Sequence, residues 1–183
     1  MQRCLRWKFT STESMYLLLT GTDPHRLIHH APWDAYWGSG SAGQGLNRQG
    51  ELTMSLRSAL LTEKVRPRTV AVVGSRGFTD ARFLGQTLED LRLESPFNTL
   101  ISGGARGADR LGESWARVND LSLVVFPAEW DRHGKRAGYI RNHWIVTAAS
   151  VVVAFWDGQS PGTKHTIEIA KTMGKPVIIH HSQ

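Results

Sequence analysis

The stretch TVAVVGSRGFTD, residues 69–80, decides how this chain folds. Its first half is a continuous apolar, β-branched run, which is typical of a strand buried on both faces. Its second half contains two glycines and leads into residues 81–93, whose apolar positions recur at helical spacing. A buried strand, a glycine turn and a helix in this order predict a parallel α/β sheet.

The same alternation continues to the C-terminus. Four more short apolar runs predict strands, at residues 98–102, 121–126, 151–156 and 177–180. The segments between them predict helices, through Leu111, Trp115 and Val118 and over residues 137–149 and 163–173. We therefore expect an α/β, Rossmann-like parallel sheet of about five strands with helices on both faces.

The pattern changes at residues 63–67 (EKVRP), where we predict a linker. Residues 1–62 are rich in Trp, Gly and His and end in a helical pattern, so we expect a mainly helical N-terminal segment. The predicted organisation is thus a segment over residues 1–62, a linker over 63–67 and a nucleotide-binding domain over 68–183.

Composition restricts the class of protein. Of 183 residues, 40% are hydrophobic and 21% charged, which excludes disorder of the whole chain. A single cysteine argues against disulfides and cysteine-based zinc sites, and we expect neither a metal nor a cofactor. Without a long apolar run, we expect no membrane partner and a cytoplasmic location. The net charge of +6 suits an anionic partner, either a small phosphate or a nucleic-acid backbone.

Three glycine-containing loops follow predicted strands and lead into predicted helices, at residues 74–77, 102–107 and 157–163. In open parallel sheets, ligands bind beyond the carboxyl ends of the strands. Glycines allow close approach of the backbone, and helix N-termini offer N–H groups to an anion, so the loops predict a phosphate site. P-loop, G-x-G-x-x-G and G-x-S-x-G motifs are absent, which argues against P-loop NTPases, ordinary dehydrogenases and α/β-hydrolases.

The loop motifs resemble those of the YspA/YpsA-like branch of the SLOG superfamily. They keep the order GSRGFTD (74–80), SGGARGAD (102–109), PAEW (127–130), GKRAGYIRN (134–142) and AFWDGQSPGT (154–163). The resemblance implies a nucleotide or ADP-ribose-like ligand over the loops, and a homodimer. With further polar residues of the same motifs, the predicted ligand-binding set is Gly74, Ser75, Arg76, Ser102, Gly103, Gly104, Arg106, Asp109, Arg141, Asn142, Asp157, Ser160, Gly162 and Thr163.

Acidic residues near the loops leave alternatives open. Asp109 is either an acid beside the glycine loop or a first-turn residue that favours the helix dipole. Asp157 either contacts a ribose or stabilises its turn. Phosphoribohydrolases of the superfamily carry a glutamate soon after a Gly–Thr pair, but here the first acid after Thr163 is Glu168. We predict that Glu168 is solvated, which argues against hydrolysis at this loop.

Basic and aromatic residues leave further alternatives. Arg141 and Asn142 lie either at the crevice or on a solvated helix face. Trp130 and Trp156 either stack on a base or pack at the strand ends.

The N-terminal segment resembles the C-terminal half of the NADAR domain of YbiA-like N-glycosidases. The matching motifs are RWKF (6–9), LLLTG (17–21), LIHHAPWDAYWGSG (27–40), GLNRQGEL (45–52) and MSLR (54–57). The resemblance implies catalytic roles for Asp34 and Trp37. Because the N-terminal half of that domain has no counterpart, we expect Trp33, Tyr36 and Trp37 to be exposed. We expect a separate chain to complete the half-domain, with dimerisation or no completion at all as the alternatives.

Both resemblances concern the same class of ligand. They predict a protein that binds a nucleotide or an ADP-ribose or NAD-derived ligand, with N-glycosidic bond hydrolysis as the chemistry that would accompany binding. One alternative is a non-catalytic nucleotide sensor or sponge in phage–host conflict. A second is binding of single-stranded DNA, as in DNA-processing proteins. Whether the chain is an N-glycoside hydrolase is left open.

Overall fold

The computed structural model describes residues 2–63 and 68–181. The chain divides into two compact units, Met1–Arg66 and Pro67–Gln183, and each is described by itself. Apart from Glu63, the last residue of a helix, the predicted linker over residues 63–67 lies outside the described residues.

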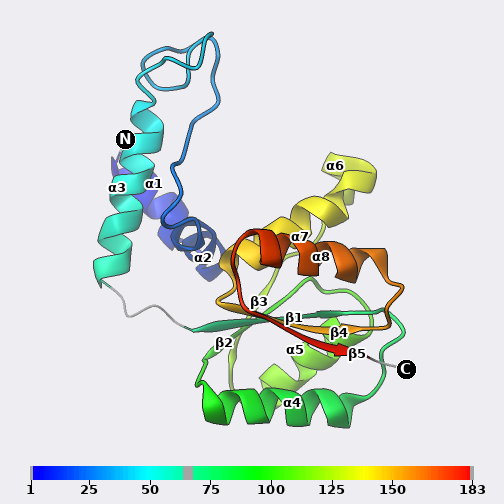
Figure 1. Cartoon of the computed structure of the whole chain (residues 1–183). Helices are drawn as coiled ribbons and strands as arrows, with labels where there is room; N and C mark the ends of the chain where they lie inside the picture. The colour runs from blue at the N-terminus through cyan, green and yellow to red at the C-terminus, as the bar shows by residue number, and fades with distance from the viewer. Residues whose placement is uncertain (1, 64–67, 182–183) are drawn as a thin grey trace. The chain divides into compact units, whose positions relative to one another are not determined.

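The second unit is built on a five-stranded sheet in which every paired strand is parallel (Figure 1). The strands lie in the order β3-β2-β1-β4-β5. Their bounds are β1 (Thr69–Gly74), β2 (Thr99–Ser102), β3 (Ser122–Val125), β4 (Val151–Trp156) and β5 (Val177–His181). The predicted Rossmann-like parallel sheet is confirmed.

Helices cover both faces of this sheet (Figure 1). One face carries α4 (Ala81–Glu94) and α5 (Ala108–Val118), and the other carries α7 (Ala137–Ala148) and α8 (Pro161–Thr172). The short helix α6 (Trp130–His133) and a 3-10 turn (Gly134–Arg136) connect β3 to α7. Helix α8 begins two residues before the predicted start, because Pro161 has the backbone angle that suits a first helical position.

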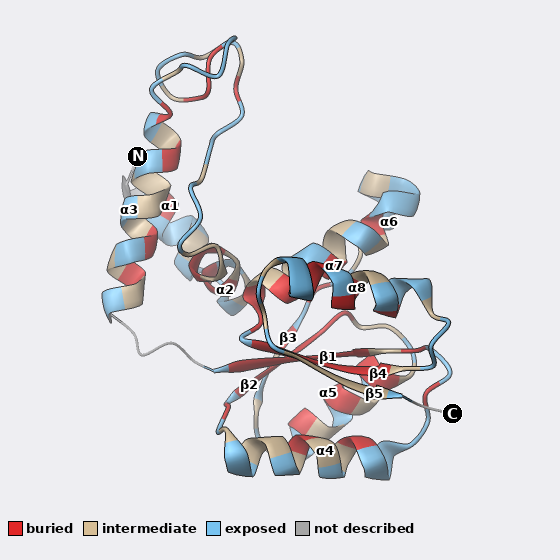
Figure 2. Ribbon diagram, viewed as in Figure 1, coloured by how far each residue is buried: buried red, intermediate tan, exposed pale blue. Residues whose placement is uncertain are grey.

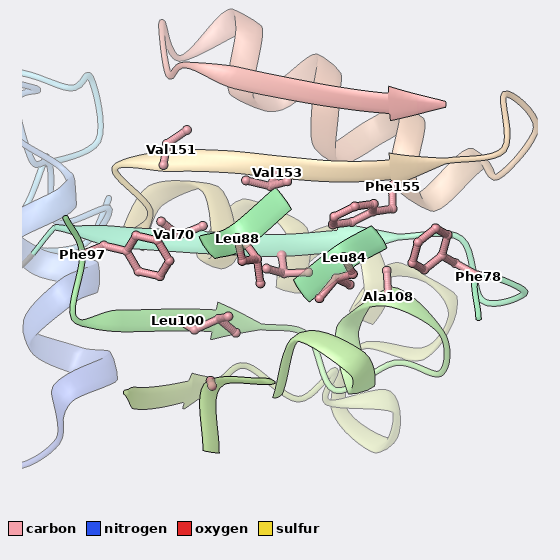
Figure 3. Close-up of a cluster of buried hydrophobic side chains, with 12 residues drawn as sticks. Val70, Phe78, Leu84, Leu88, Phe97, Leu100, Ala108, Val151, Val153 and Phe155 are labelled. Atoms are coloured by element: carbon pink, nitrogen blue, oxygen red, sulfur yellow. The ribbon is translucent and has the colours of Figure 1, made fainter. Parts of the chain in front are cut away.

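Strand β1 lies at the centre of the core (Figure 2). Its first five residues are buried, and Val70 and Val72 pack with Leu84 and Leu88 of α4 in one apolar cluster (Figure 3). Helix α5 approaches the strand closely at Gly112, where an added Cβ would lie 2.9 Å from the Val72 side chain. Glycine at this position therefore lets α5 pack against β1.

The order of the strands places a crevice between the ends of β1 and β4. From β1 the chain moves outward to β2 and β3, then crosses to β4 and β5 on the other side. Ligands bind at such switch points in open α/β sheets. Ser75 joins the two loops there, because its N–H donates to the Phe155 carbonyl (2.9 Å) and its hydroxyl accepts from the N–H of Asp157 (3.1 Å).

The first unit consists of three helices and a long irregular segment. The helices are α1 (Gln2–Thr10), α2 (Glu13–Gly21) and α3 (Arg48–Glu63), so the predicted helical N-terminal part is confirmed. The segment before α3 is held by Asn47, whose side chain accepts from the His29 N–H and donates to the Leu27 carbonyl, both at 2.8 Å. Over the ranges that the structure covers, no helix is long and apolar enough to cross a bilayer.

Truncation of Leu88 tests the core. Leu88→Ala removes a fully buried side chain of α4, and we expect a loss of about 2–5 kcal/mol in the free energy of unfolding. The control is Leu93→Ala in the same helix, where the side chain is 76% exposed and the expected change is within about 0.5 kcal/mol. Urea unfolding measures both, and equal losses would contradict the described packing.

Candidate functional site

A cleft of about 400 Å³ lies at the carboxyl ends of β1 and β4, within the size range of small-molecule sites. All three predicted loops contribute to it. Nine of the residues predicted to bind ligand line this cleft: Gly74, Arg76, Asp109, Arg141, Asn142, Asp157, Ser160, Gly162 and Thr163. Their location agrees with the prediction from sequence, while their contact with a ligand stays a prediction.

The other five predicted residues do not line the cleft: Ser75, Ser102, Gly103, Gly104 and Arg106. Ser102 is fully buried, and its hydroxyl donates to Glu113 (2.8 Å) and accepts from the Gly104 N–H (3.0 Å). These bonds shape the loop behind the cleft wall. Arg106 is exposed on the same loop. Ligand contacts by these five residues remain predictions.

Asp109 and Arg141 form the buried polar part of the cleft. The Asp109 carboxylate accepts the N–H groups of Gly103 (3.1 Å) and Ala105 (3.3 Å), and it lies 3.9 Å from Nη1 of Arg141. Arg141 Nη1 donates to the Gly103 carbonyl at 2.6 Å. Burial raises the pKa of Asp109 to about 6, although Arg141 and the two N–H groups oppose this shift. Asp109 is therefore an acid beside the glycine loop and also a first-turn residue of α5, so its position meets both alternatives.

The space around Arg141 explains one glycine. A Cβ added at Gly103 would overlap the Arg141 guanidinium, so glycine lets this side chain keep its position beside Asp109. Burial also lowers the pKa of Arg141, and the charge of nearby Arg76 contributes in the same direction. Two guanidinium groups thus face one cleft, and a bound anion would relieve their mutual repulsion.

The start of α8 closes the other side of the cleft. Asp157 accepts the N–H groups of Gln159 (2.9 Å) and Ser160 (2.7 Å), and these bonds lower its pKa. It therefore stabilises its turn while also lining the cleft. Helix geometry leaves the N–H groups of Gly162 and Thr163 without intrahelical acceptors, so they offer an anion two donors.

Helix α7 contributes Arg141 and Asn142 to the cleft instead of presenting them on a solvated face. Asn142 is buried, and its amide donates to the Gly162 carbonyl (3.2 Å). This bond fixes the first turn of α8 beside α7. The interpretation of both residues as crevice residues therefore agrees with their position.

Sequence reasoning missed six residues of the lining: Val73, Gly77, Ala105, Ile145, Pro161 and Thr166. Gly77, Ala105 and Pro161 lie within the predicted loops and could have been named from them. Val73 and Ile145 form an apolar surface, and Thr166 follows Gly162 by one helical turn. Apolar core residues carry no signal that separates cleft positions from ordinary packing.

Three other residues lie outside the cleft lining. Glu168 is exposed on α8, as predicted. Its carboxylate lies 3.9 Å from Nζ of Lys164. Trp156 packs at the end of β4, where its Nε1 donates to the Ser160 carbonyl (3.1 Å). Trp130 is 54% exposed on α6.

In the described part of the chain, no group of three His, Cys, Asp or Glu side chains is placed to hold a metal ion.

The predicted catalytic residues of the first unit lie in the irregular segment between α2 and α3. Asp34 accepts the N–H groups of Tyr36 (3.0 Å) and Trp37 (2.8 Å), which orders a tight turn. Trp33 is 86% and Tyr36 53% exposed, whereas Trp37 is half-buried. Trp33 and Tyr36 are therefore exposed as predicted, whereas the predicted exposure of Trp37 is wrong, since its ring packs edge-to-face with Tyr36 (centroids 5.0 Å apart).

Comparison with known proteins identifies the family. The model of the YspA, cpYpsA-related SLOG family matches residues 68–133. The Gene 61 protein of Mycobacterium phage D29 is 39% identical to this chain over 118 residues. The match covers 61% of this chain and 94% of the phage protein. The chain belongs to the YspA, cpYpsA-related SLOG family. The matched SLOG residues include the strands β1 and β2 and the first two glycine loops.

Two further proteins resemble this chain, one in sequence and one in fold. The N-glycosidase YbiA of Escherichia coli is 45% identical over 64 residues, or 35% of this SLOG protein, which spans 40% of YbiA's length. The predicted kinship with YbiA-like proteins is confirmed. The single-stranded-DNA-binding DNA processing protein A of Helicobacter pylori has a similar fold, with a TM-score of 0.51 and 17% identity over 64% of this chain and 66% of that protein.

Stability as a function of pH tests the burial of Asp109. The pKa of Asp109 rises from 3.8 to about 6 on folding, so the folded state holds this proton more tightly than the unfolded chain does. Stability contributed by Asp109 is therefore present below pH 4 and is lost as the pH rises to about 6. The loss is on the order of 3 kcal/mol.

Asp109→Asn keeps an acceptor for both N–H groups but does not titrate. We expect the unfolding free energy of the wild type, minus that of Asp109→Asn, to fall between pH 4 and pH 6.5. Urea unfolding at several pH values measures this difference. Parallel pH curves for the two proteins would contradict a raised pKa.

Proposed function

We propose that the SLOG domain binds a nucleotide or an ADP-ribose or NAD-derived ligand, with its phosphate in the cleft between β1 and β4. One observation carries this proposal: Arg76, Arg141 and the N-terminus of α8 converge on one cleft. Guanidinium groups match phosphate geometry, and a helix N-terminus adds donors and a favourable dipole. The apolar surface of Val73 and Ile145 suits a sugar or base beside the phosphate.

Arg76 provides the most direct test because it lines the cleft from an exposed position. We expect Arg76→Ala to weaken the binding of AMP and of ADP-ribose at least about tenfold, since it removes a charge-assisted hydrogen bond. Arg82→Ala removes the same charge from the exposed start of α4, outside the cleft, and is expected to change affinity less than about twofold. Isothermal titration of both ligands into the wild type and the two variants measures these affinities.

An equal effect of both substitutions would indicate only long-range electrostatics and would contradict a phosphate site at Arg76.

Strong binding of single-stranded oligonucleotides, with steep salt dependence and no binding of AMP, would favour the DNA-binding alternative. The DNA processing protein A likeness supports that alternative through its fold alone.

A second candidate function is cleavage of an N-glycosidic bond, which the relationship to YbiA favours. The proposed base is Asp34. One of its oxygens, Oδ1, orders the turn, and we assign the other to accept a proton from the water that attacks the anomeric carbon. Trp37 borders the same turn and is proposed to hold the substrate beside it.

Asp34→Asn tests this assignment while preserving an acceptor for the turn. We expect release of free base from ADP-ribosyl or phosphoribosyl-amine substrates to fall at least about 100-fold, because a general base contributes about that much. Glu168→Gln, which changes an exposed carboxylate, is the control and should leave the rate unchanged. Chromatography of the products measures both rates. Intact ligand after incubation with the wild type would instead support a non-catalytic sensor.

The resemblances also give expectations about partners. A homodimer is proposed for the SLOG domain, and a separate chain is proposed to complete the half-domain around Trp33 and Tyr36. The exposure of these two aromatic side chains supports the second expectation. A cytoplasmic location remains part of the same proposal.

A further inference from the structure

A second cavity, of about 500 Å³, adjoins the cleft on the α4 side of the loop that follows β1. Gly77 and Asp157 line both the cleft and this cavity. A Cβ added at Gly77 would meet no atom of the described residues within 4 Å, so open space lies at the boundary. A ligand seated in the cleft can therefore extend past Gly77 into the cavity.

The two hollows differ in chemistry. The cleft contains two guanidinium groups beside the carboxylates of Asp109 and Asp157, whereas the described lining of the cavity contains no Lys or Arg and includes the carboxylates of Asp80 and Asp157. A phosphate is favoured in the cleft and disfavoured in the cavity. The cavity suits an uncharged or cationic group joined to a phosphate in the cleft.

Aromatic side chains determine which group this is. Phe78 and Phe83 line the cavity, and the ring of Phe83 is 42% exposed. Phe83 is held perpendicular to Phe155 (centroids 6.0 Å apart) and to His180 (5.3 Å). Figure 3 shows Phe78 in the loop that follows β1 and Phe155 near the end of β4. A fixed, partly exposed ring offers a stacking surface for a planar base.

We propose that this cavity is a second subsite, which takes the distal nucleoside of a dinucleotide whose diphosphate lies in the cleft. The proposal rests on the proposed function, because it requires a phosphate beside Arg76. Asp157 stands at the boundary with a carboxylate fixed by two backbone N–H groups, and it accepts a hydrogen bond from a ribose hydroxyl there. The base stacks on Phe83.

Isothermal titration of the full chain with NAD and with AMP tests the subsite. We expect the wild type to bind NAD at least about tenfold more tightly than AMP, since stacking of one base contributes about this factor or more. Phe83→Leu keeps an apolar side chain but removes the ring, and should abolish most of this preference while changing AMP affinity less than twofold. Phe83→Tyr should retain the preference.

Thermal unfolding without ligand shows whether each variant is folded. Equal affinities of the wild type for NAD and AMP would overturn the subsite and leave the proposed phosphate site intact. A preference for NAD that persists in Phe83→Leu would also overturn it. Failure of the wild type to bind either compound would overturn both the subsite and the proposed function.

Discussion

The burial of β1 on both faces is the constraint on which the second unit depends. Its residues Val70 to Val73 are apolar and its backbone is paired with β2 on one side and β4 on the other. A strand in this position needs helices on both faces to exclude water. The order in which the strands follow one another along the sheet changes direction between β1 and β4, and the loops leave a crevice at this point. The position of the cleft is therefore a consequence of how the core is covered.

The buried pair of Asp109 and Arg141 shows how the loops were adapted to a site. Burying two ionisable groups is unfavourable unless hydrogen bonds compensate. Asp109 receives two backbone N–H groups, and Arg141 bonds to the Gly103 carbonyl, so the second glycine loop is fixed around them. The loop thereby holds one guanidinium at the cleft wall, while Arg76 on the first loop keeps an exposed side chain. One cation is thus pre-positioned and the other is adaptable.

Sequence reasoning located the loops more accurately than their individual roles. The periodicity of residues 68–183 predicted the strands and helices, because a doubly covered sheet demands continuous apolar runs and amphipathic helices. In the sequence, Ser75, Ser102 and Asp109 are alike as polar residues of the glycine-containing motifs. Only the folded chain shows that Ser75 joins two loops, that Ser102 ties its own loop to Glu113 of α5, and that Asp109 faces the cleft. The partners of Ser75 in the β4 loop and the Arg141 side chain beside Asp109 lie far away in sequence, so local patterns could not reveal them.

Local patterns and contiguous motifs were enough to predict the parallel sheet, the three loops at its carboxyl edge and the kinship of both parts of the chain. Tertiary structure decided which loop residues face the cleft, the raised pKa of Asp109 and the neighbouring aromatic cavity. Each of these depends on side chains from several loops and helices meeting at one edge, as when Phe83 of α4 meets His180 of β5. Burial and proximity of this kind arise only when the chain has folded.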